Sequence, residues 1–502
     1  MYSLPKGPSL ASDAPVLLWF RKDLRLDDNL ALIKSAKSNR PVIPVYIDCG
    51  EASPYSPLGA AQRWWLHHSL EALGKALDKH GSRLVLRKGE PEAVLRKLAK
   101  ECGAEVVAVN TVPDPLAEAE DKTLAEALKQ DEIAFHAFEG ALLHDPVKLL
   151  TGGGTGFKVY TPFWRALNQQ APPSPPLGIP KEWKHPGTFP ESISLSSFKL
   201  LPEKPDWATG FADLWTPGEA GATKRLHEFA EGALAGYAVA RDMPGVDGTS
   251  GLSPHLALGE ISPRRIWQEI DKQQADRKGG PSGEDISRYL KELVWREFSY
   301  HLLYHFPDLA KTNWNTSFDA FEWHQDSAGF KAWCKGETGY PIVDAGMRQL
   351  WQHGWMHNRV RMIVGSFLIK DLLIDWREGE AWFRDTLVDA DPASNSASWQ
   401  WVAGSGADAA PFFRVFNPTL QGEKFDPQGD YIRRYIPELA KLPNSLIHKP
   451  SEASLIELKA AGISLGKTYP KPIVDHKMAR DRALAALAAL KSDGERGSKK
   501  SK

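Results

Sequence analysis

Two kinds of hydrophobic pattern divide the chain. From Val16 to about Phe138, short runs rich in β-branched residues alternate with segments of helical periodicity. The expected strands are VLLWF, VIPVYID, RLVLR, EVVAV and IAFHAF, and the first helices are expected near Asn29 and from Gly59. Strands that alternate with helices are typical of a doubly wound α/β fold with a parallel sheet. We therefore predict an α/β domain over residues 14–140.

The second pattern is helical throughout. Residues 169–205 hold the proline-rich QQAPPSPPLGIP and little periodicity, so we place an irregular connector at residues 141–216. Apolar residues then recur at three- and four-residue spacing, as in KRLHEFAEGALAGYAVAR, RYLKELVWREFSYHLLYHF and RVRMIVGSFLIKDLLIDW. The pattern predicts an all-α domain over residues 217–490, followed by a solvated basic tail over residues 491–502.

Composition is that of an ordinary globular protein, with 42% hydrophobic and 25% charged residues among 502. There is no apolar run long enough to span a bilayer, and the first residues lack the apolar centre of a secretory signal. We therefore expect a monomer in the cytoplasm, with no membrane partner. The net charge of −1 means that any DNA site must be a local basic patch.

The sequence shows neither a metal-binding motif nor, after the first strand, a dinucleotide-binding motif. The three cysteines lie far apart, and His353 and His357 stand four residues apart without a third ligand at a recognisable spacing. We predict no metal site. The first strand is followed by RKDLRLDD in place of GxGxxG, so a dinucleotide site in the α/β domain would lack its phosphate cradle.

Two long segments of the helical half carry a family resemblance. These are TGYPIVDAGMRQLWQHGWMHNRVRM and LIDWREGEAWFRDTLVDADPASNSASWQWVAGSGADAAPFFRVFNPTLQGEKFD. With them the chain resembles the DNA photolyase and cryptochrome family across the whole domain order. The resemblance implies a helical FAD-binding domain and blue-light repair of cyclobutane pyrimidine dimers in double-stranded DNA. A reduced FAD would pass an electron to a flipped-out dimer, which makes the enzyme a carbon–carbon lyase. The alternative is a cryptochrome-type photoreceptor without repair activity.

The segment GYAVARDMPGVDGTSGLSPHLALGEISP has two interpretations. It is either a capped loop, with Thr249, Ser250 or Ser253 as helix cap, or, as the resemblance implies, the site of the FAD diphosphate. The family often has Arg where this chain has Gly251, so one charge contact to phosphate would be absent. The residues that the resemblance assigns to FAD are Tyr237, Thr249, Ser250, Gly251, Leu252, Ser253, Arg296, Arg361, Asp389, Ala390, Asp391 and Asn395.

Glu292, Trp295 and Arg296 lie on one helix face. A Glu–Arg pair at this spacing is usually a weak surface salt bridge. The resemblance instead implies that Glu292 is catalytic and hydrogen-bonds a base carbonyl of the dimer, while Trp295 stacks on it. Arg241 is either a phosphate contact or a cation at a helix end. The resemblance assigns to DNA or to the lesion Arg241, Glu292, Trp295, Asn358, Arg359, Met362, Trp401, Arg414, Gln421 and Lys424.

Two positions favour dimer repair over the other activities of the family. Six-four photolyases carry His where this chain has Met362, and a thioether has no proton to donate. Plant cryptochromes usually carry Asp where this chain has Asn395, the second residue that we assign to catalysis. An amide hydrogen-bonds flavin N5 but gives it no proton. We also expect Asp389 to pair with Arg361.

The chain holds 18 tryptophans, which serve either core packing or redox and stacking chemistry. Trp323, Trp376 and Trp399 match the three-tryptophan electron-transfer chain of the family. For an antenna, 5,10-methenyltetrahydrofolate is the candidate. The Cys-Lys and Asn-Glu pairs of one folate site are replaced by Ala310-Lys311 and Leu116-Ala117. QRWWLHHSL instead resembles plant cryptochromes and a related bacterial class, so Trp64 or Trp65 would stack on the pterin, or both belong to the core.

Overall fold

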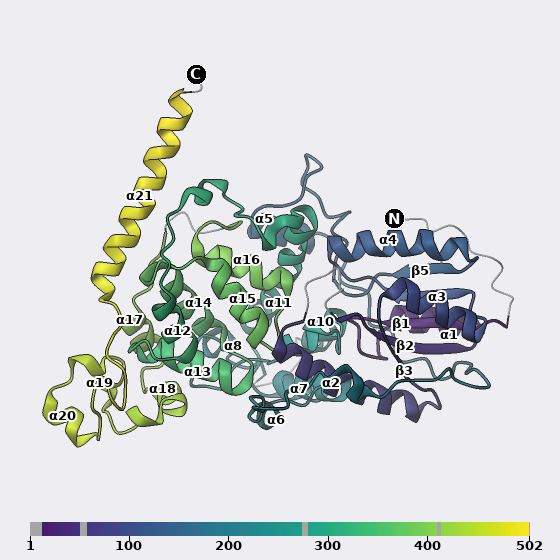
Figure 1. The fold of residues 1–502 in the computed structure, drawn as a ribbon, viewed down its shortest axis with the longest axis horizontal. Helices are drawn as coiled ribbons and strands as arrows, with labels where there is room; N and C mark the ends of the chain where they lie inside the picture. The colour runs from purple at the N-terminus through teal and green to yellow at the C-terminus, as the bar shows by residue number, and fades with distance from the viewer. Residues whose placement is uncertain (1–12, 51–57, 274–279, 409–412, 501–502) are drawn as a thin grey trace.

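The computed structural model describes residues 13–50, 58–273, 280–408 and 413–500. Its N-terminal part contains a parallel five-stranded sheet in the order β3-β2-β1-β4-β5 (Figure 1). This confirms the predicted doubly wound sheet. The strands are β1 (Val16–Phe20), β2 (Val42–Asp48), β3 (Val85–Lys88), β4 (Val106–Asn110) and β5 (Ala134–Phe138), and the helices are α1 (Leu30–Lys37), α2 (Ala60–Lys79), α3 (Pro91–Cys102) and α4 (Pro115–Gln130).

Alternation of side chains along the strands builds two separate cores. Leu18 and Phe20 of β1 pack with residues of α1 and α2 on one face of the sheet. Leu17 and Trp19 pack with residues of α3 and α4 on the other face. Because β1 is covered on both faces, its five residues are all apolar and all buried.

The segment predicted as a connector contains three short helices, α5 (Tyr160–Asn168), η2 (Leu195–Phe198) and α6 (Phe211–Leu214). The rest of the described chain is helical, as predicted. Its elements are α7 (Glu219–Glu231), α8 (Tyr237–Ala240), α9 (Ser253–Ala257), α10 (Pro263–Lys272), α11 (Gly283–His305), η3 (Pro307–Ala310), η4 (Thr316–Ala320), α12 (Ser327–Lys335), α13 (Pro341–His353), α14 (Asn358–Ser366), η5 (Phe367–Asp371), α15 (Trp376–Thr386), α16 (Pro392–Ala403), α17 (Pro418–Phe425), α18 (Asp430–Tyr435), η6 (Pro437–Leu439), α19 (Asn444–Ile447), η7 (Pro450–Glu452), α20 (Leu455–Ala460) and α21 (His476–Lys500).

Two segments with an unbroken helical pattern are interrupted in the structure. The segment 224–241 stops after α7 and restarts as α8, because Gly236 adopts a left-handed φ of 88°. The segment 359–376 passes from α14 into the π-helix η5, and Leu373 then has a φ of 56° before α15 begins. At the C-terminal end, α21 continues to Lys500, so residues 491–500 of the predicted basic tail lie within a helix that extends from the domain (Figure 1), and residues 501–502 lie outside the described residues.

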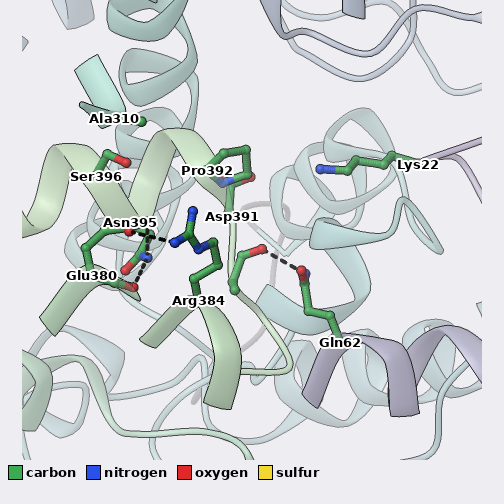
Figure 2. A pocket seen from close by; sticks show the side chains of 10 residues that line it. Lys22, Gln62, Ala310, Glu380, Arg384, Asp391, Pro392, Asn395 and Ser396 are labelled. Carbon is green, nitrogen blue, oxygen red and sulfur yellow. Dashed lines mark hydrogen bonds and ion pairs between the residues drawn. The ribbon is translucent and has the colours of Figure 1, made fainter. Parts of the chain in front are cut away.

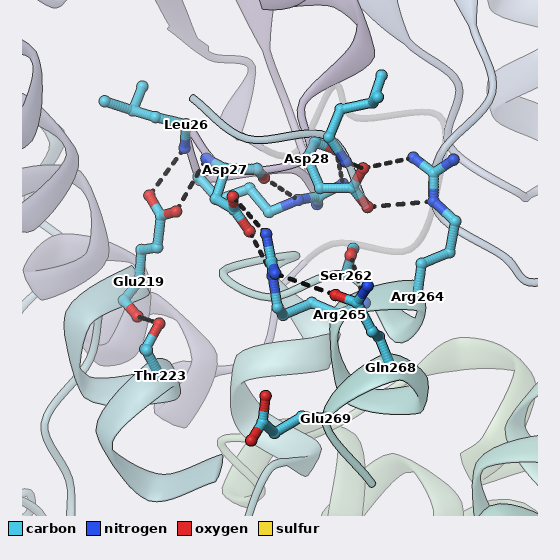
Figure 3. A network of polar contacts seen from close by, with 12 residues as sticks. Leu26, Asp27, Asp28, Glu219, Thr223, Ser262, Arg264, Arg265, Gln268 and Glu269 are labelled. Carbon is cyan, nitrogen blue, oxygen red and sulfur yellow. Dashed lines mark hydrogen bonds and ion pairs between the residues drawn. The ribbon is translucent and has the colours of Figure 1, made fainter. Parts of the chain in front are cut away.

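Ion pairs and buried hydrogen bonds join the two parts of the molecule. Arg264 and Arg265 of α10 pair with Asp28 and Asp27, both at 2.7 Å, while Glu219 of α7 accepts the backbone N–H groups of Leu26 and Asp27 (Figure 3). The loop after β1 is thereby fixed against the helical part. Within the part of the chain that the structure describes, no helix is both long and apolar enough to span a membrane.

Candidate functional site

Three arginines near the ends of α8 and α14 each face a carboxylate. Their pairings are Arg241 with Glu292, Arg359 with Asp242 at 2.9 Å and Arg361 with Asp389 at 2.7 Å. The acids come from α11, from the end of α8 and from the segment before α16. Since α8 ends at Ala240, the adjacent residues Arg241 and Asp242 connect it to both α11 and α14.

Glu292 does not pair with Arg296, the partner that their i,i+4 spacing suggested. Glu292 pairs with Arg241, whereas Arg296, one turn away on α11, donates to Glu297 and to the carbonyl of Ala141. The i,i+4 surface salt bridge considered from the sequence is therefore absent between these residues. The guanidinium of Arg296 also lies over the ring of Tyr300, at 4.9 Å.

Trp295 of α11 is half-buried and stacked on Tyr160 of α5, with ring centroids 3.7 Å apart. The Tyr160 hydroxyl donates to the carbonyl of Lys291, which is also on α11. One face of the Trp295 indole is thus covered by the protein. Trp401, the second aromatic residue predicted at the lesion, is partly buried against the core of the helical domain.

Asp389 joins several residues predicted to bind FAD. Its Oδ2 atom accepts hydrogen bonds from Arg361 and from the Ser253 hydroxyl, at 2.7 Å and 2.6 Å. Its Oδ1 atom is buried and has no hydrogen-bond partner among the described residues. A buried carboxylate oxygen of this kind needs a donor. The N–H groups of a flavin would supply one, so this arrangement fits the cofactor.

Asn395 faces a small cavity at the boundary between the two domains (Figure 2). Its amide nitrogen donates to Glu380 Oε1 at 2.8 Å, and burial raises the pKa of Glu380. Lys22 and Gln62 of the α/β domain also line this cavity, whose volume of about 20 Å³ has room for one water molecule. Gln62 donates to the carbonyl of Ala390 at 2.7 Å.

Asp391 caps α16. Its side chain accepts from the N–H of Ser394 at 2.7 Å and from the hydroxyl of Tyr300, the ring beneath Arg296. Asp389, Ala390 and Asp391 are all buried, and each of them makes a hydrogen bond to a different helix. This segment is held by α14, by α11 and by α2 of the other domain.

The predicted diphosphate segment is a loop that ends in the short helix α9. The N-cap of α9 is Leu252, so the interpretation of Thr249, Ser250 or Ser253 as its side-chain cap is wrong. Gly251 has a φ of 58°, and a Cβ atom there would lie 2.5 Å from Nη1 of Arg225. The place beside Gly251 therefore already holds an arginine side chain, from α7. Tyr237 is buried nearby, under the Arg241 guanidinium at 5.6 Å.

The three tryptophans predicted for electron transfer share one core. Trp376 and Trp399 are buried in the same hydrophobic cluster, and Trp323 is partly buried against it. A side chain at Gly379, one turn after Trp376, would come within 2.3 Å of the Trp399 ring. The Trp376 N–H donates to the side-chain oxygen of Asn313 at 2.9 Å. Trp399 also contacts Trp333, with centroids 6.2 Å apart.

Comparison with known proteins identifies the family. Residues 16–181 match DNA photolyase, and residues 289–489 match the FAD binding domain of DNA photolyase. A deoxyribodipyrimidine photo-lyase of Agrobacterium fabrum is 60% identical over 478 residues, which cover 95% of this chain and 98% of the relative. The chain belongs to the photolyase/cryptochrome family.

Both branches of the photolyase/cryptochrome family are similar to this chain. The crystal structure of a bacterial class III photolyase from Agrobacterium tumefaciens matches with a TM-score of 0.92 and 59% identity, covering 97% of this chain and 99% of that one. Cryptochrome-2 of Arabidopsis thaliana is 38% identical, over 95% of this chain and 79% of the relative. Membership alone therefore does not separate repair from signalling, and the residues of the site must do so.

In this photolyase/cryptochrome fold, the two tryptophans considered for an antenna are core residues. Trp65 is fully buried, donates to Glu260 at 2.9 Å and packs edge-on to Trp215. Trp64 is 7% exposed and packs edge-on to Phe211. Both rings are buried, so the structure agrees with the interpretation that they belong to the core.

The remaining predicted residues lie at or near the surface. Asn358 begins α14, Arg414 precedes α17, and Gln421 and Lys424 lie on α17; Asn358, Arg414 and Lys424 are exposed. No group of three or more His, Cys, Asp or Glu side chains among the described residues is arranged to hold a metal ion.

Sequence reasoning missed three residues of this photolyase/cryptochrome site: Tyr160, Arg225 and Asp242. Each touches a predicted residue from a different part of the chain, namely Trp295, Gly251 and Arg359. Asp242 directly follows Arg241, a predicted phosphate contact, and this position in the sequence could have indicated that Asp242 belongs to the site. Nothing in the local sequence of Tyr160 or Arg225 indicates their contacts.

Proposed function

We propose that the protein repairs cyclobutane pyrimidine dimers in double-stranded DNA, using blue light and FAD. The observation that carries this proposal is the contact network at the end of α8. It joins Glu292 of α11 to Arg241, and Asp242 to Arg359, whose guanidinium lies 3.7 Å from the sulfur of Met362. Residues with the chemistry for a flipped-out dimer thus converge from two helices. The 60% identical photo-lyase supports the same activity.

Bound FAD supplies the absorption of light and the electron that splits the cyclobutane ring. Glu292 hydrogen-bonds a base carbonyl of the dimer. This contact replaces the ion pair with Arg241, which therefore opens when the dimer enters. Arg241 is then available for a DNA phosphate.

The flavin ring is held by Arg361, Asp389 and Asn395. The unpartnered Oδ1 atom of Asp389 would accept a hydrogen bond from the ring, while Arg361 holds the Oδ2 atom of the same carboxylate. The amide of Asn395 has its nitrogen bound to Glu380, which leaves its oxygen toward the cofactor. Because an amide has no acidic proton, Asn395 does not protonate the flavin, as an aspartate at this position would.

The loop of residues 249–253 would hold the diphosphate, with Arg225 supplying the positive charge. An arginine at position 251 would meet Arg225 and would also have to adopt a φ of 58°. A glycine there leaves the guanidinium of Arg225 beside the loop backbone. Substitution of Arg225 by Gln therefore weakens FAD binding more than substitution of the exposed neighbour Lys224 does.

Trp399, Trp376 and Trp323 form an electron path between the cofactor and the surface. Trp376 and Trp399 are excluded from water, and Trp323 is half-buried at the outer end. The neutral amide of Asn313 is the hydrogen-bond acceptor of Trp376, so an oxidised Trp376 has no base there to take its proton. The positive charge then moves outward along the path.

The activity is tested by mixing the purified protein with dimer-containing duplex DNA and counting intact pyrimidines in blue light and in the dark. We expect repair in light only. Glu292→Ala is expected to keep FAD and lose repair, whereas Glu231→Ala, on the exposed face of α7, keeps both. A protein that binds FAD and responds to light but leaves dimers intact would be a cryptochrome-type photoreceptor.

We also propose that the protein acts as a monomer in the cytoplasm. No contact described above requires a second copy of the chain to complete the site. Light scattering of the purified protein at micromolar concentration is expected to give the mass of one chain. Cell fractionation tests the location.

A further inference from the structure

Asp242 holds one end of the Arg359 guanidinium. Its Oδ1 atom accepts from Arg359 Nη2 at 2.9 Å, and the two side chains are 34% and 21% exposed. The two residues lie 117 positions apart, on the segment after α8 and on the first turn of α14. The guanidinium also lies over the ring of Phe425, at 4.4 Å. Arg359 is therefore fixed by an ion pair and by an aromatic face.

The Nη1 amino group of the same guanidinium has no strong acceptor among the described residues. The Nε atom of Arg359 is buried and has no hydrogen-bond partner among the described residues. Nη1 has a 3.7 Å contact with the sulfur of Met362, which is a weak acceptor. Because thioether sulfur is so weak an acceptor, the N–H groups of Nη1 remain available to an oxygen atom of a phosphate.

The neighbouring charges do not take over the role of Asp242. Arg241 and Arg361 have their own carboxylates, Glu292 and Asp389. The buried imidazole of His357, which lies beside these groups, is neutral at physiological pH because burial lowers its pKa to about 4. Among the described residues, the only carboxylate within 4 Å of the Arg359 guanidinium is that of Asp242.

We propose that Asp242 is a positioning residue for lesion recognition, an inference that rests on the proposed repair function. By binding Nη2, it aims the Nη1 amino group of Arg359 at a backbone phosphate of the flipped-out dimer. The same ion pair prevents Arg359 from swinging outward to the phosphates of undamaged DNA. Asp242 thereby raises the preference of the protein for damaged over undamaged duplex.

The test measures dark binding of two otherwise identical duplexes, with and without one dimer, at several salt concentrations. Asp242→Asn keeps the size of the side chain but removes the charge that holds Arg359. We expect affinity for dimer DNA to fall about tenfold, the worth of a charge-assisted hydrogen bond. Affinity for undamaged DNA is expected to rise, with a salt dependence steeper by about one phosphate contact.

Two further variants separate positioning from folding and from net charge. Asp242→Glu restores the carboxylate and is expected to recover much of the preference for dimer DNA. Asp131→Asn removes the same charge from an exposed ion pair with Arg96 in the α/β domain, and is expected to change neither affinity. FAD content and melting temperature, measured for each variant, report whether the fold is intact.

The possible outcomes are distinct. If Asp242→Asn leaves the ratio of the two affinities unchanged, Asp242 does not position Arg359 for the lesion and the inference is overturned. That result would leave the repair function intact. If the wild-type protein binds the two duplexes equally and does not repair the dimer in light, the proposed function fails and this inference fails with it.

Discussion

Tyr160 stacks on Trp295 with their ring planes 5° apart and their centroids separated by 3.7 Å. Tyr160 belongs to α5, in the segment between the two domains, and Trp295 belongs to α11. One face of the indole is therefore occupied by the protein itself, and a base that stacks on Trp295 must use the opposite face. The connector thus contacts a residue that we propose to bind the lesion.

Replacing Tyr160 by Leu is expected to weaken the binding of dimer-containing DNA. The stacked pair contributes about 1 kcal/mol beyond its buried area, which corresponds to about fivefold in affinity if Trp295 loses its orientation. FAD binding is expected to stay unchanged. Fluorescence anisotropy with a labelled duplex measures the affinity.

The matched control is Tyr160→Phe, which keeps the stack and loses only the hydrogen bond to Lys291. It is expected to bind dimer DNA almost as well as the wild type. Equal losses in the two variants would mean that the hydroxyl, and not the ring, orients α11. Unchanged binding in Tyr160→Leu would show that Trp295 needs no support from α5.

Trp376→Phe is expected to abolish most of the light-driven reduction of oxidised FAD while repair by chemically reduced protein continues. Phenylalanine fills much of the same space but is far harder to oxidise. Loss of the Asn313 hydrogen bond and of packing lowers stability by about 1–3 kcal/mol. Absorbance during illumination with an external reductant follows the reduction.

Trp19→Phe is a control for packing alone. Trp19 is equally buried, in β1, and it also has an arginine over its ring, at 4.9 Å compared with 4.8 Å for Trp376. It is expected to lose similar stability and to keep photoreduction. If Trp376→Phe reduces its flavin as fast as Trp19→Phe does, electrons reach FAD by another route.

The fold was predictable because local patterns encode it. The central strand β1 is apolar at every position because it is covered on both faces, whereas the edge strand β3 begins with an apolar pair and ends in Arg87 and Lys88. The breaks in the helical domain were not predictable in this way. Leu373 has a left-handed φ although its side chain fits the helical pattern, because tertiary packing around η5 imposes that conformation.

The candidate site was predictable only through resemblance, since spacing alone does not distinguish Glu292 from a surface acid. The contacts of the site depend on segments that are distant in the chain. Arg225 fills the place beside Gly251, and Asp242 binds Arg359, although no periodicity relates these positions. Such pairs follow from the packing of α7, α8 and α14, which a single sequence does not specify.

Gln62→Met is expected to loosen the segment before α16 and to weaken FAD binding. Gln62 is buried and donates to the carbonyl of Ala390, so methionine of similar size leaves that carbonyl unpaired. A buried unpaired carbonyl costs about 1–3 kcal/mol. Thermal unfolding and equilibrium release of FAD measure the two effects. The exposed Gln170→Met provides the control. Identical behaviour of both variants would mean that this bridge from the α/β domain does not support the cofactor site.

His301 makes stability depend on pH. Its ring is fully buried among His144, His305 and Phe163, and its Nε2 accepts from the N–H of Phe157 at 2.8 Å. Burial lowers the pKa of His301 from its ordinary value of 6.5 to about 3. Between these values the unfolded chain binds a proton that the folded chain does not, so stability is complete above pH 6.5 and falls as the pH drops. At pH 5 this group alone removes about 2 kcal/mol.

His301→Gln tests this dependence, because a glutamine oxygen accepts the Phe157 hydrogen bond and does not titrate. Urea unfolding of both proteins at pH 7.5 and pH 5.0 gives the loss of stability for each, and all other titrating groups are common to the two. We expect the wild type to lose about 2 kcal/mol more than the variant over this interval. If the losses are equal, His301 is protonated in the folded protein at pH 5. The cluster with His144 and His305 would then accommodate a positive charge, against its burial and its apolar neighbours.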